Sequence, residues 1–447
     1  MDAAEAVAAR IRRLRVARVW GEVTAIRAGL VIVGGLGRRA SIGDRVSLGD
    51  GALFGEIVAL GADQAEVLPE GAADGLSVGA PAELLFAPAI APSEAWVGRI
   101  VDPFGRPLDG RPLATGRTER GFQTPPPPAA GRNRLGGRLA TGLAVFDTLL
   151  PLVRGQRIGL FAGSGVGKST LLSALARGVE ADVVVIAMVG ERGRELREFV
   201  ETTLGPEGMA RAVVVAATSD QPPLIRRRCA WAAMAVAEHF RDQGRHVLFL
   251  ADSITRFAEA HREIALASGE APSYRGFPPS TSQTIMALAE RSGPGPEGSG
   301  DITAIFSVLV AGSDMEEPVA DILRGVLDGH VVLDRKIAER GRFPAVDVLR
   351  SVSRSLPHAA SPAENALIGR ARAALGAYAE SELMIRAGLY AQGSDAVLDE
   401  AVRLYPGLDS FVTRNAQGTD DSFRLLAAAL ESGRRAAPAA SGSPPRI

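Results

Sequence analysis

A glycine-rich segment holds the residues of this chain best suited to binding phosphate. It lies between a short apolar strand expected at 158–161 and an expected helix that carries several leucines. Its members are Ala162, Gly163, Ser164, Gly165, Val166, Gly167, Lys168, Ser169 and Thr170. Glycines let the backbone turn so that successive N–H groups face one polyphosphate. The helix N-terminus that follows adds free donors and a partial positive charge.

Two side chains of this segment have distinct chemistry. Lys168 can bring a full charge to the β- and γ-phosphates of a nucleotide, and the hydroxyl of Ser169 can bind Mg²⁺. The order of strand, loop and helix is the context that the G-x-x-x-x-G-K-[ST] pattern requires. The first position of that pattern is Ala162 here, and alanine is small enough to take the place of glycine. The sequence therefore predicts a phosphate-binding loop that works with Mg²⁺.

Acidic residues follow two of the expected strands. Asp252 comes directly after the apolar run 247–251, and an acid at that position meets Mg²⁺, usually through water. Glu191 follows the run 183–189, and one helix and one parallel strand fill the interval between it and Lys168. A right-handed crossover returns Glu191 to the sheet edge of the loop, where its carboxylate can orient or deprotonate an attacking water.

Glu195 and Glu198 are the rivals of Glu191 for the role of base. Both carry the same charge, but they sit further into the following helix. Glu191 is therefore the predicted general base.

The strands that must position these residues are nearly all apolar. They are expected at 183–189, 212–216, 247–251 and 302–310. Strands without polar alternation are buried on both faces, which indicates an α/β fold with a mainly parallel sheet covered by helices. Ligands in such sheets gather at the carboxyl ends of the strands.

Residues 19–88 have a different pattern. Short apolar pieces at 31–33, 45–48, 54–60 and 65–68 alternate with turns, which predicts a small closed β-barrel. Barrels of this size often bind oligonucleotides through aromatic and basic residues. Few such residues occur here, so a structural or ring-forming role is the better interpretation.

The remaining segments complete the expected domain organisation. Residues 122–135 read as a stiff exposed connection, and 269–300 as a Gly-, Pro- and Ser-rich loop that either moves during catalysis or connects passively. The expected parts are an arm at 1–18, a barrel at 19–88, a core at 89–361, a helical domain at 362–433 and a disordered tail at 434–447. The helical domain should be interrupted near Gly393 and Gly407.

The arm at 1–18 reads as a helix with two possible roles. Val7, Ile11 and Leu14 share one face, and arginines surround them. It is either a frayed terminal helix or an arm that docks on a partner helix or on an anionic membrane surface.

Bulk properties exclude several classes of protein. The 447 residues carry a net charge of −1, which gives no electrostatic footprint for nucleic acid. The single cysteine, Cys229, excludes an internal disulfide and fits a reducing cytosol. There is no run of 18 apolar residues and no secretory signal pattern at the start.

The motifs together resemble those of type III protein-export ATPases, which are relatives of the catalytic subunits of rotary ATP synthases. The matching segments extend over most of the chain, from about residue 20 to 411. They are Gly155–Thr170, Val97–Asp102, Gly105–Gly110, Gly190–Arg192, Ala251–Phe257, Glu317–Asp321 and Phe343–Arg354. The resemblance implies an N-terminal barrel, a RecA-like core, a C-terminal helical domain and a homohexameric ring.

The resemblance also implies roles that spacing alone could not assign. Phe343 matches the aromatic residue that packs on adenine, and Phe411 is a candidate second wall. Arg192 matches a residue of the catalytic turn. Arg354 matches the arginine finger that rotary relatives insert into a neighbour's site. Because this chain carries both Glu191 and Arg354, a ring of identical subunits would be self-sufficient.

The function implied is that of an ATP hydrolase, with ATP and Mg²⁺, that energises flagellar protein export from the cytoplasmic face of the inner membrane. Implied partners are a helical stator protein at the arm, export substrates and chaperones at the helical domain, a central-stalk-like protein and a membrane export gate, but no nucleic acid. The alternatives are an injectisome ATPase, a rotary ATP synthase β subunit and a Rho-like RNA translocase. The Ser351–Arg354 signature and the Phe161–Ser164 loop argue against the β subunit, and the barrel's composition argues against Rho.

Overall fold

The computed structural model describes residues 17–310 and 315–431, which form two compact units. The first unit holds the described residues up to 136 together with 154–164 and 181–327. The second holds 137–153, 165–180 and the described residues from 328 onward. The division passes through the glycine-rich loop, between Ser164 and Gly165. The domain limits expected from chain order remain a prediction.

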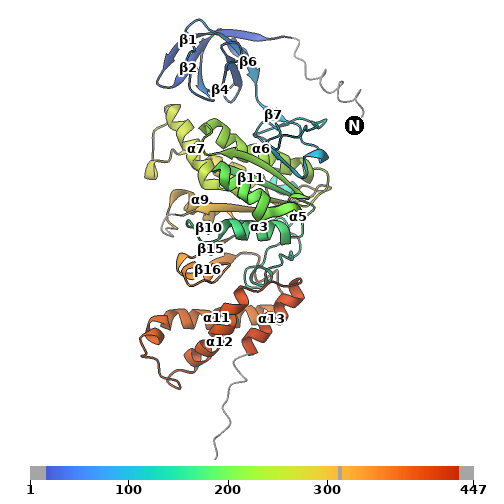
Figure 1. Ribbon diagram of the computed structural model, residues 1–447, viewed down its shortest axis with the longest axis vertical. Coiled ribbons are helices and arrows are strands. Elements are labelled where there is room, and N and C mark those ends of the chain that lie inside the picture. The colour runs from blue at the N-terminus through green and yellow to red at the C-terminus, as the bar shows by residue number, and fades with distance from the viewer. Residues whose placement is uncertain (1–16, 311–314, 432–447) are drawn as a thin grey trace, which may run out of the picture. The chain divides into compact units, whose positions relative to one another are not determined.

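A closed six-stranded barrel opens the first unit, as predicted (Figure 1). Around the barrel the strand order is β1-β2-β5-β4-β3-β6, and all neighbouring pairs are antiparallel. Alternate apolar side chains fill its interior, among them Val31, Val46 and Val67, each fully buried. The strands are β1 Val19–Arg27, β2 Leu30–Gly34, β3 Arg45–Leu48, β4 Leu53–Leu60, β5 Gln64–Pro69 and β6 Pro81–Phe86.

A parallel sheet forms the rest of the first unit's framework. Its strands run in the order β10-β14-β13-β11-β12-β8, and every pair among them is parallel. This confirms the reading of the unbroken apolar runs as buried parallel strands. The strands are β8 Arg99–Val101, β10 Arg157–Ala162, β11 Val183–Glu191, β12 Ala212–Thr218, β13 Val247–Asp252 and β14 Ile302–Leu309, with a separate small pair of β7 Ala89–Ile90 and β9 Arg120–Gly121.

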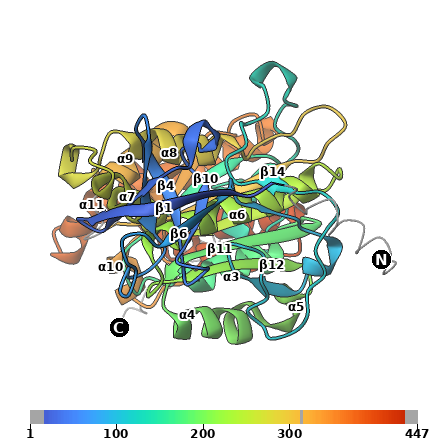
Figure 2. The same cartoon turned by 90° about the horizontal axis from the view of Figure 1, so that it is seen from above.

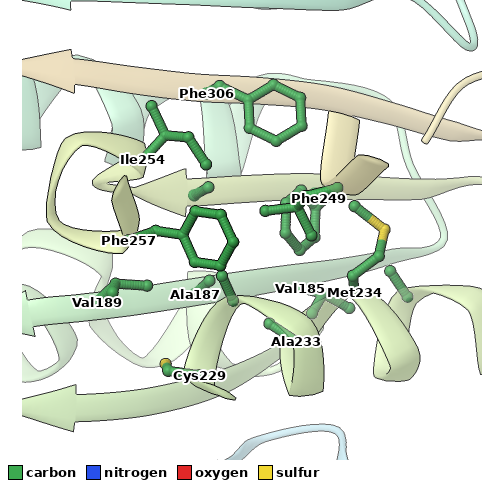
Figure 3. Close-up of a cluster of buried hydrophobic side chains, with 14 of the residues drawn as sticks. Val185, Ala187, Val189, Cys229, Ala233, Met234, Phe249, Ile254, Phe257 and Phe306 are labelled. Carbon is green, nitrogen blue, oxygen red and sulfur yellow. The ribbon is translucent and has the colours of Figure 1, made fainter. Parts of the chain in front are cut away.

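Helices cover this sheet, and two of them, α6 and α7, pack directly on its central strands (Figure 2). Figure 3 shows the resulting core, in which Met234 and Phe257 from the helices meet Val185, Phe249 and Phe306 from the strands. The helices of the unit are α4 Gly193–Glu198, the π-helical turn η4 Phe199–Leu204, α5 Gly205–Met209, α6 Pro223–Arg241, α7 Ile254–Ala267, α8 Ser280–Glu290 and α9 Pro318–Val326.

Reading residues 269–300 as loop throughout was wrong, because α8 occupies the middle of this segment. Thr281, Ile285, Leu288 and Ala289 are its buried residues, and their spacing places them on one face. The neighbouring prolines and glycines hid this short apolar stripe.

The second unit combines an antiparallel strand pair, β15 and β16, with helices. Ser361 caps α11 in a capping box with Glu364, and Ser422 of α13 donates a 2.8 Å hydrogen bond to buried Asp147 of α2. The elements are α2 Ala144–Asp147, α3 Lys168–Gly178, β15 Gly329–Leu333, α10 Arg335–Glu339, β16 Val346–Ser353, α11 Pro362–Arg386, α12 Ala396–Val412 and α13 Thr419–Glu431.

One of the two interruptions expected in the helical region is present. The chain leaves the helix around Gly393, between α11 and α12. The break expected near Gly407 was wrong, because α12 continues through Pro406 and Gly407. Leu404, Leu408 and Phe411 are buried along one side of α12, and this packing holds the helix across the weak positions.

The α/β fold class, with an N-terminal barrel and a C-terminal helical region, is confirmed by these elements. The arm and tail expected at 1–18 and 434–447 lie almost wholly outside the described residues, and Ala17 and Arg18 are neither helix nor strand. Within the described ranges, no helix combines the length and the apolar character that crossing a bilayer requires.

Candidate active site

The glycine-rich loop begins where β10 ends, at the carboxyl edge of the parallel sheet. Ala162 is the last residue of β10 and is fully buried, and its carbonyl accepts a 3.1 Å hydrogen bond from the Val310 N–H. The parallel register pairs Ala162 with Leu309 of β14. Gly163 and Ser164 therefore leave the sheet at this edge.

The continuation of the loop, in the second unit, has the backbone that the glycines were expected to provide. Gly165 has φ of 76° and Gly167 has φ of 86°, both in the left-handed region that other residues rarely adopt. Gly167 is the N-cap of α3, whose first residue is Lys168. Ser169 and Thr170 lie in the first helical turn, so their N–H groups belong to the helix N-terminus.

Asp252 lies at the same edge of the sheet as Ala162. It ends β13 and is only 3% exposed, and Ser307 Oγ of β14 donates a 2.6 Å hydrogen bond to its Oδ1. The register aligns Ala251 of β13 with Phe306 of β14. A buried carboxylate oriented by a neighbouring hydroxyl is therefore present where the sequence placed it.

The donor set fits Mg²⁺ bound together with a nucleotide. Among residues 17–310 and 315–431, no group of three His, Cys, Asp or Glu could hold a metal ion by itself. Mg²⁺ commonly takes one or two protein oxygens and completes its shell with water and phosphate oxygens. The Ser169 hydroxyl and the Asp252 carboxylate are oxygen donors of this kind, and their role as ligands remains a prediction.

Glu191 is the last residue of β11, the strand beside β13. The parallel register pairs Met188 with Asp252, so Glu191 extends three positions beyond that level. This places it at the carboxyl edge, as the crossover argument predicted. Its function as a base remains a prediction.

Arg192 distinguishes Glu191 from its neighbour Glu195. Arg192, which is 78% exposed, makes a 2.6 Å ion pair with Glu195. This pair and, to a smaller extent, the adjacent Glu191 carboxyl hold the pKa of Glu195 below its usual value. The charge of Glu195 is thus engaged by Arg192, and the assignment of Glu191 as the base remains a prediction.

Two residues of this edge were not assigned from the sequence. Ser307 orients Asp252, and its signal was a polar residue inside an otherwise apolar strand. Arg256 of α7 lies beside Gly190, where an added Cβ would come within 3.2 Å of the Arg256 Cβ. The pKa of Arg256 is raised by the hydrogen bond with Glu259 and, to a smaller extent, by the charges of Glu191 and Glu195.

In the second unit, Phe343 lies against the phosphate loop. An added Cβ at Gly167 would come within 3.2 Å of Phe343 Cδ1, and the residue is 50% exposed. The ring thus offers a face beside the helix N-terminus, where the adenine role was expected. Phe411, the candidate second wall, is only 2% exposed in α12 and offers almost no surface to a base.

Arg354 follows directly after β16 and is exposed. Its backbone N–H donates a 3.0 Å hydrogen bond to the carbonyl of Asp328, which fixes the chain at this point. A surface position is what an arginine acting on a neighbouring subunit requires, and that role remains a prediction.

Two family descriptions match the chain. Residues 142–353 match the ATP synthase alpha/beta family, nucleotide-binding domain. Residues 360–429 match the T3SS EscN ATPase C-terminal domain. The first match covers the loop, Glu191 and Asp252 and ends one residue before Arg354, and the second covers the C-terminal helices.

Individual relatives match over nearly the whole length. A flagellum-specific ATP synthase of Caulobacter vibrioides is 45% identical over 95% of this chain and 98% of its own. The assembled ATPase EscN of the enteropathogenic E. coli type III secretion system has a TM-score of 0.85 at 34% identity, over 92% of this chain and 100% of its own. The same ATPase in complex with its central stalk EscO has a TM-score of 0.83 at 35% identity, with the same coverage.

Proposed function

Because the chain belongs to the ATP synthase alpha/beta family, in the branch of flagellar and type III secretion ATPases, we propose that it hydrolyses ATP with Mg²⁺ to energise flagellar protein export. The observation that carries the catalytic part is the sheet edge itself. The ends of β10, β13 and β11 bring the start of the phosphate loop, Asp252 and Glu191 to one edge.

The residues have separate tasks in the proposed reaction. The backbone N–H groups of the loop and the Lys168 ammonium hold the β- and γ-phosphates. Glu191 orients the attacking water and accepts its proton as the water oxygen bonds to the γ-phosphorus. The bond from that phosphorus to the β–γ bridging oxygen breaks, and ADP leaves. Magnesium held by Ser169 and Asp252 would supply charge neutralisation at the phosphates.

Charge that develops on the γ-phosphoryl group requires cations. Arg192 and Arg256 lie next to Glu191 and Glu195. Both are therefore candidates to stabilise the negative charge that develops on the γ-phosphoryl group. Arg354 would supply the remaining charge from the neighbouring subunit of a homohexamer. The assembled state of the relative EscN supports ring formation.

The partners follow the same reasoning. The EscN complex with its central stalk supports a stalk-like partner for this chain. We further propose that the helical domain meets export substrates and chaperones and that the arm docks on a helical stator protein. These contacts would hold the ring at the export gate, on the cytoplasmic face of the inner membrane.

An injectisome ATPase is the second candidate, because EscN from such a system shares the fold over 92% of this chain. The flagellar assignment is supported by the flagellum-specific relative, which is 45% identical over nearly the whole of both chains. Replacing the host gene with a Glu191→Gln copy tests it. Loss of flagellar filaments is expected, whereas intact filaments with impaired effector secretion would contradict the flagellar assignment.

The enzymatic part is tested on purified full-length protein. We expect ATP hydrolysis that needs Mg²⁺, stops with EDTA and is unaffected by added RNA. Stimulation by RNA would favour the Rho-like alternative, and no hydrolysis under any condition would refute the proposed activity.

A further inference from the structure

The Phe343 ring is carried by a turn that has little regular structure of its own. Residues 341–345 lie between α10 and β16 and form neither helix nor strand. Backbone hydrogen bonds tie its two ends: the Gly341 N–H donates to the Ala338 carbonyl at 2.9 Å, and the Asp334 N–H donates to the Ala345 carbonyl at 2.9 Å. Since the ring must stay over Gly167 to face a nucleobase, other contacts have to fix this turn.

Arg342 supplies such contacts from within the turn. Its Nη2 donates a 2.8 Å hydrogen bond to the Val346 carbonyl, and its Nη1 lies at the 3.5 Å limit from the Pro344 carbonyl. One guanidinium thus reaches the carbonyls on both sides of Ala345. The planar fork of arginine suits this double contact better than the single nitrogen of an ammonium group.

The same guanidinium connects the turn to α12. Its Nε lies 3.0 Å from Asp409 Oδ1, and the Arg342 side chain is only 12% exposed. Burial lowers the pKa of Arg342, and the Asp409 carboxylate opposes that shift by stabilising the charged form. A partly buried, paired charge that also donates to backbone carbonyls is geometrically specific rather than a loose surface contact.

The ion pair between Arg342 and Asp409, called the bridge below, borders a pocket. A cavity of about 430 Å³ is lined by Arg342 and Asp409 together with the stacked rings of Tyr378 and Tyr405. The Arg342–Asp409 ion pair borders this space and is a direct side-chain contact between the turn and α12.

We propose that Arg342 and Asp409 are positioning residues for the nucleobase, which hold the turn against α12 so that the Phe343 ring stays over Gly167 as a platform for a purine. The inference rests on the proposed ATPase function and adds to it the residues that set base affinity. The bridge contacts neither phosphate nor the attacking water, so it acts on nucleotide binding and not on the chemical step.

Arg340 provides a matched control. It lies two residues earlier and lines the same cavity, and it connects the end of α10 to α11 through a 2.7 Å ion pair with Glu382. Within the described part of the chain, its side chain makes no hydrogen bond or ion pair with the turn that carries Phe343. If the ion pairs only tether the helices, the loss of either pair should have the same effect.

The experiment compares Arg342→Ala, Asp409→Ala, the double variant and Arg340→Ala as full-length proteins. Base stacking on an aromatic ring is worth about five- to a hundredfold in affinity, and a misplaced ring should lose part of this. We expect KM for ATP to rise about three- to tenfold in the first two variants, with kcat within about twofold. The double variant should be no worse than Arg342→Ala, since both changes break one bridge.

A base-free competitor separates the platform from the phosphate loop. The inhibition constant of inorganic tripolyphosphate should be unchanged in every variant, because the tripolyphosphate has no base to stack. Arg342→Lys and Asp409→Asn keep more of the local structure and should give smaller rises in KM, so they serve if an alanine variant fails to fold.

Three results would overturn the inference: an unchanged KM for ATP in all the bridge variants, an equal rise in Arg340→Ala, or an equal loss of tripolyphosphate binding. Absence of ATP hydrolysis by the unmodified protein would instead refute the proposed function, so the two failures are distinguishable.

Discussion

Glu191 and Glu195 are carboxylates of the same size, but Glu191 ends β11 and Glu195 lies in the first turn of α4, so their surroundings differ. Arg192 pairs with Glu195 and keeps the pKa of that carboxyl low. At the scale of single residues, Arg192 thus engages Glu195, the rival of Glu191, and substitutions can test the two carboxylates separately.

Replacing Glu191 should separate binding from chemistry. Glu191→Gln leaves the phosphate loop intact, so ATP should still bind, while hydrolysis falls by about 10²–10⁴-fold because the proton acceptor is lost. Steady-state hydrolysis and equilibrium binding of ATP measure the two effects. Glu195→Gln is the matched control and should retain most of the activity.

The opposite pattern would reassign the base. If Glu191→Gln keeps more than about a tenth of the unmodified rate while Glu195→Gln loses activity, Glu195 is the general base. Lys168→Ala should weaken both ATP binding and hydrolysis, which distinguishes loss of the phosphate lysine from loss of the base.

At the scale of elements, a buried ion cluster joins α6 to Glu56 of β4 and to Glu70, which directly follows β5. Arg228 of α6 is 1% exposed and makes a 2.8 Å ion pair with Glu56 and a 2.7 Å pair with Glu70. Arg227 also pairs with Glu56, at 2.6 Å, and Arg45 pairs with Glu70, at 2.7 Å. Each buried carboxylate thus has two guanidinium partners.

Removing one partner from such a cluster is costly, because a charge is left buried without full compensation. Arg228→Ala should lower the free energy of unfolding by about 3–5 kcal/mol. The three tryptophans, Trp20, Trp96 and Trp231, all lie in the first unit, so their fluorescence in urea reports its unfolding. Arg197→Ala, which breaks an exposed pair with Glu201, should cost about 0–1 kcal/mol.

Acid should weaken the same cluster. Burial acts to raise the pKa of Glu70, but Arg45 and Arg228 outweigh it, and the pKa lies below the ordinary 4.5. A carboxyl with a depressed pKa stabilises the fold fully above its unfolded pKa, and this contribution is lost as pH falls through the folded pKa. Unfolding midpoints should therefore drop below about pH 4.5, and less steeply in Glu70→Gln. If the unfolding midpoint falls equally steeply with pH in the unmodified protein and in Glu70→Gln, the prediction is contradicted.

At the scale of the whole molecule, one chain holds both the candidate base and the candidate arginine finger. If Lys168 and Glu191 act in one subunit and Arg354 comes from the next, rings of Lys168→Ala or of Arg354→Ala alone should be nearly inactive. An equal mixture restores an interface when an Arg354→Ala subunit supplies the loop and a Lys168→Ala subunit supplies the arginine. Random head-to-tail assembly repairs roughly a quarter of interfaces.

A single-turnover assay on the mixed protein measures this repair, because strict coupling around the ring could suppress steady-state turnover. Some hydrolysis should return on mixing. If electron microscopy confirms mixed rings and no hydrolysis returns even in one turnover, Arg354 does not act across the interface.

The sequence by itself determined the features that depend on local backbone chemistry and on strand periodicity. Gly165 and Gly167 adopt positive φ because the turn into α3 requires it. Asp252 and Glu191 reach one sheet edge because both follow unbroken apolar strands, and parallel strands end on the same side. Residues at strand ends and in tight turns are therefore predictable before any tertiary contact is known.

Only the tertiary structure decided what depends on contacts between distant residues. Packing of α12 overrode the breaking tendency of Pro406 and Gly407, and one buried face made α8 a helix within a Gly- and Pro-rich segment. The bridge joins Arg342 to Asp409, and no sequence pattern indicated that these two residues would form an ion pair. The free energy of such contacts comes from burial and pairing across the fold, so no local pattern in the chain can show it.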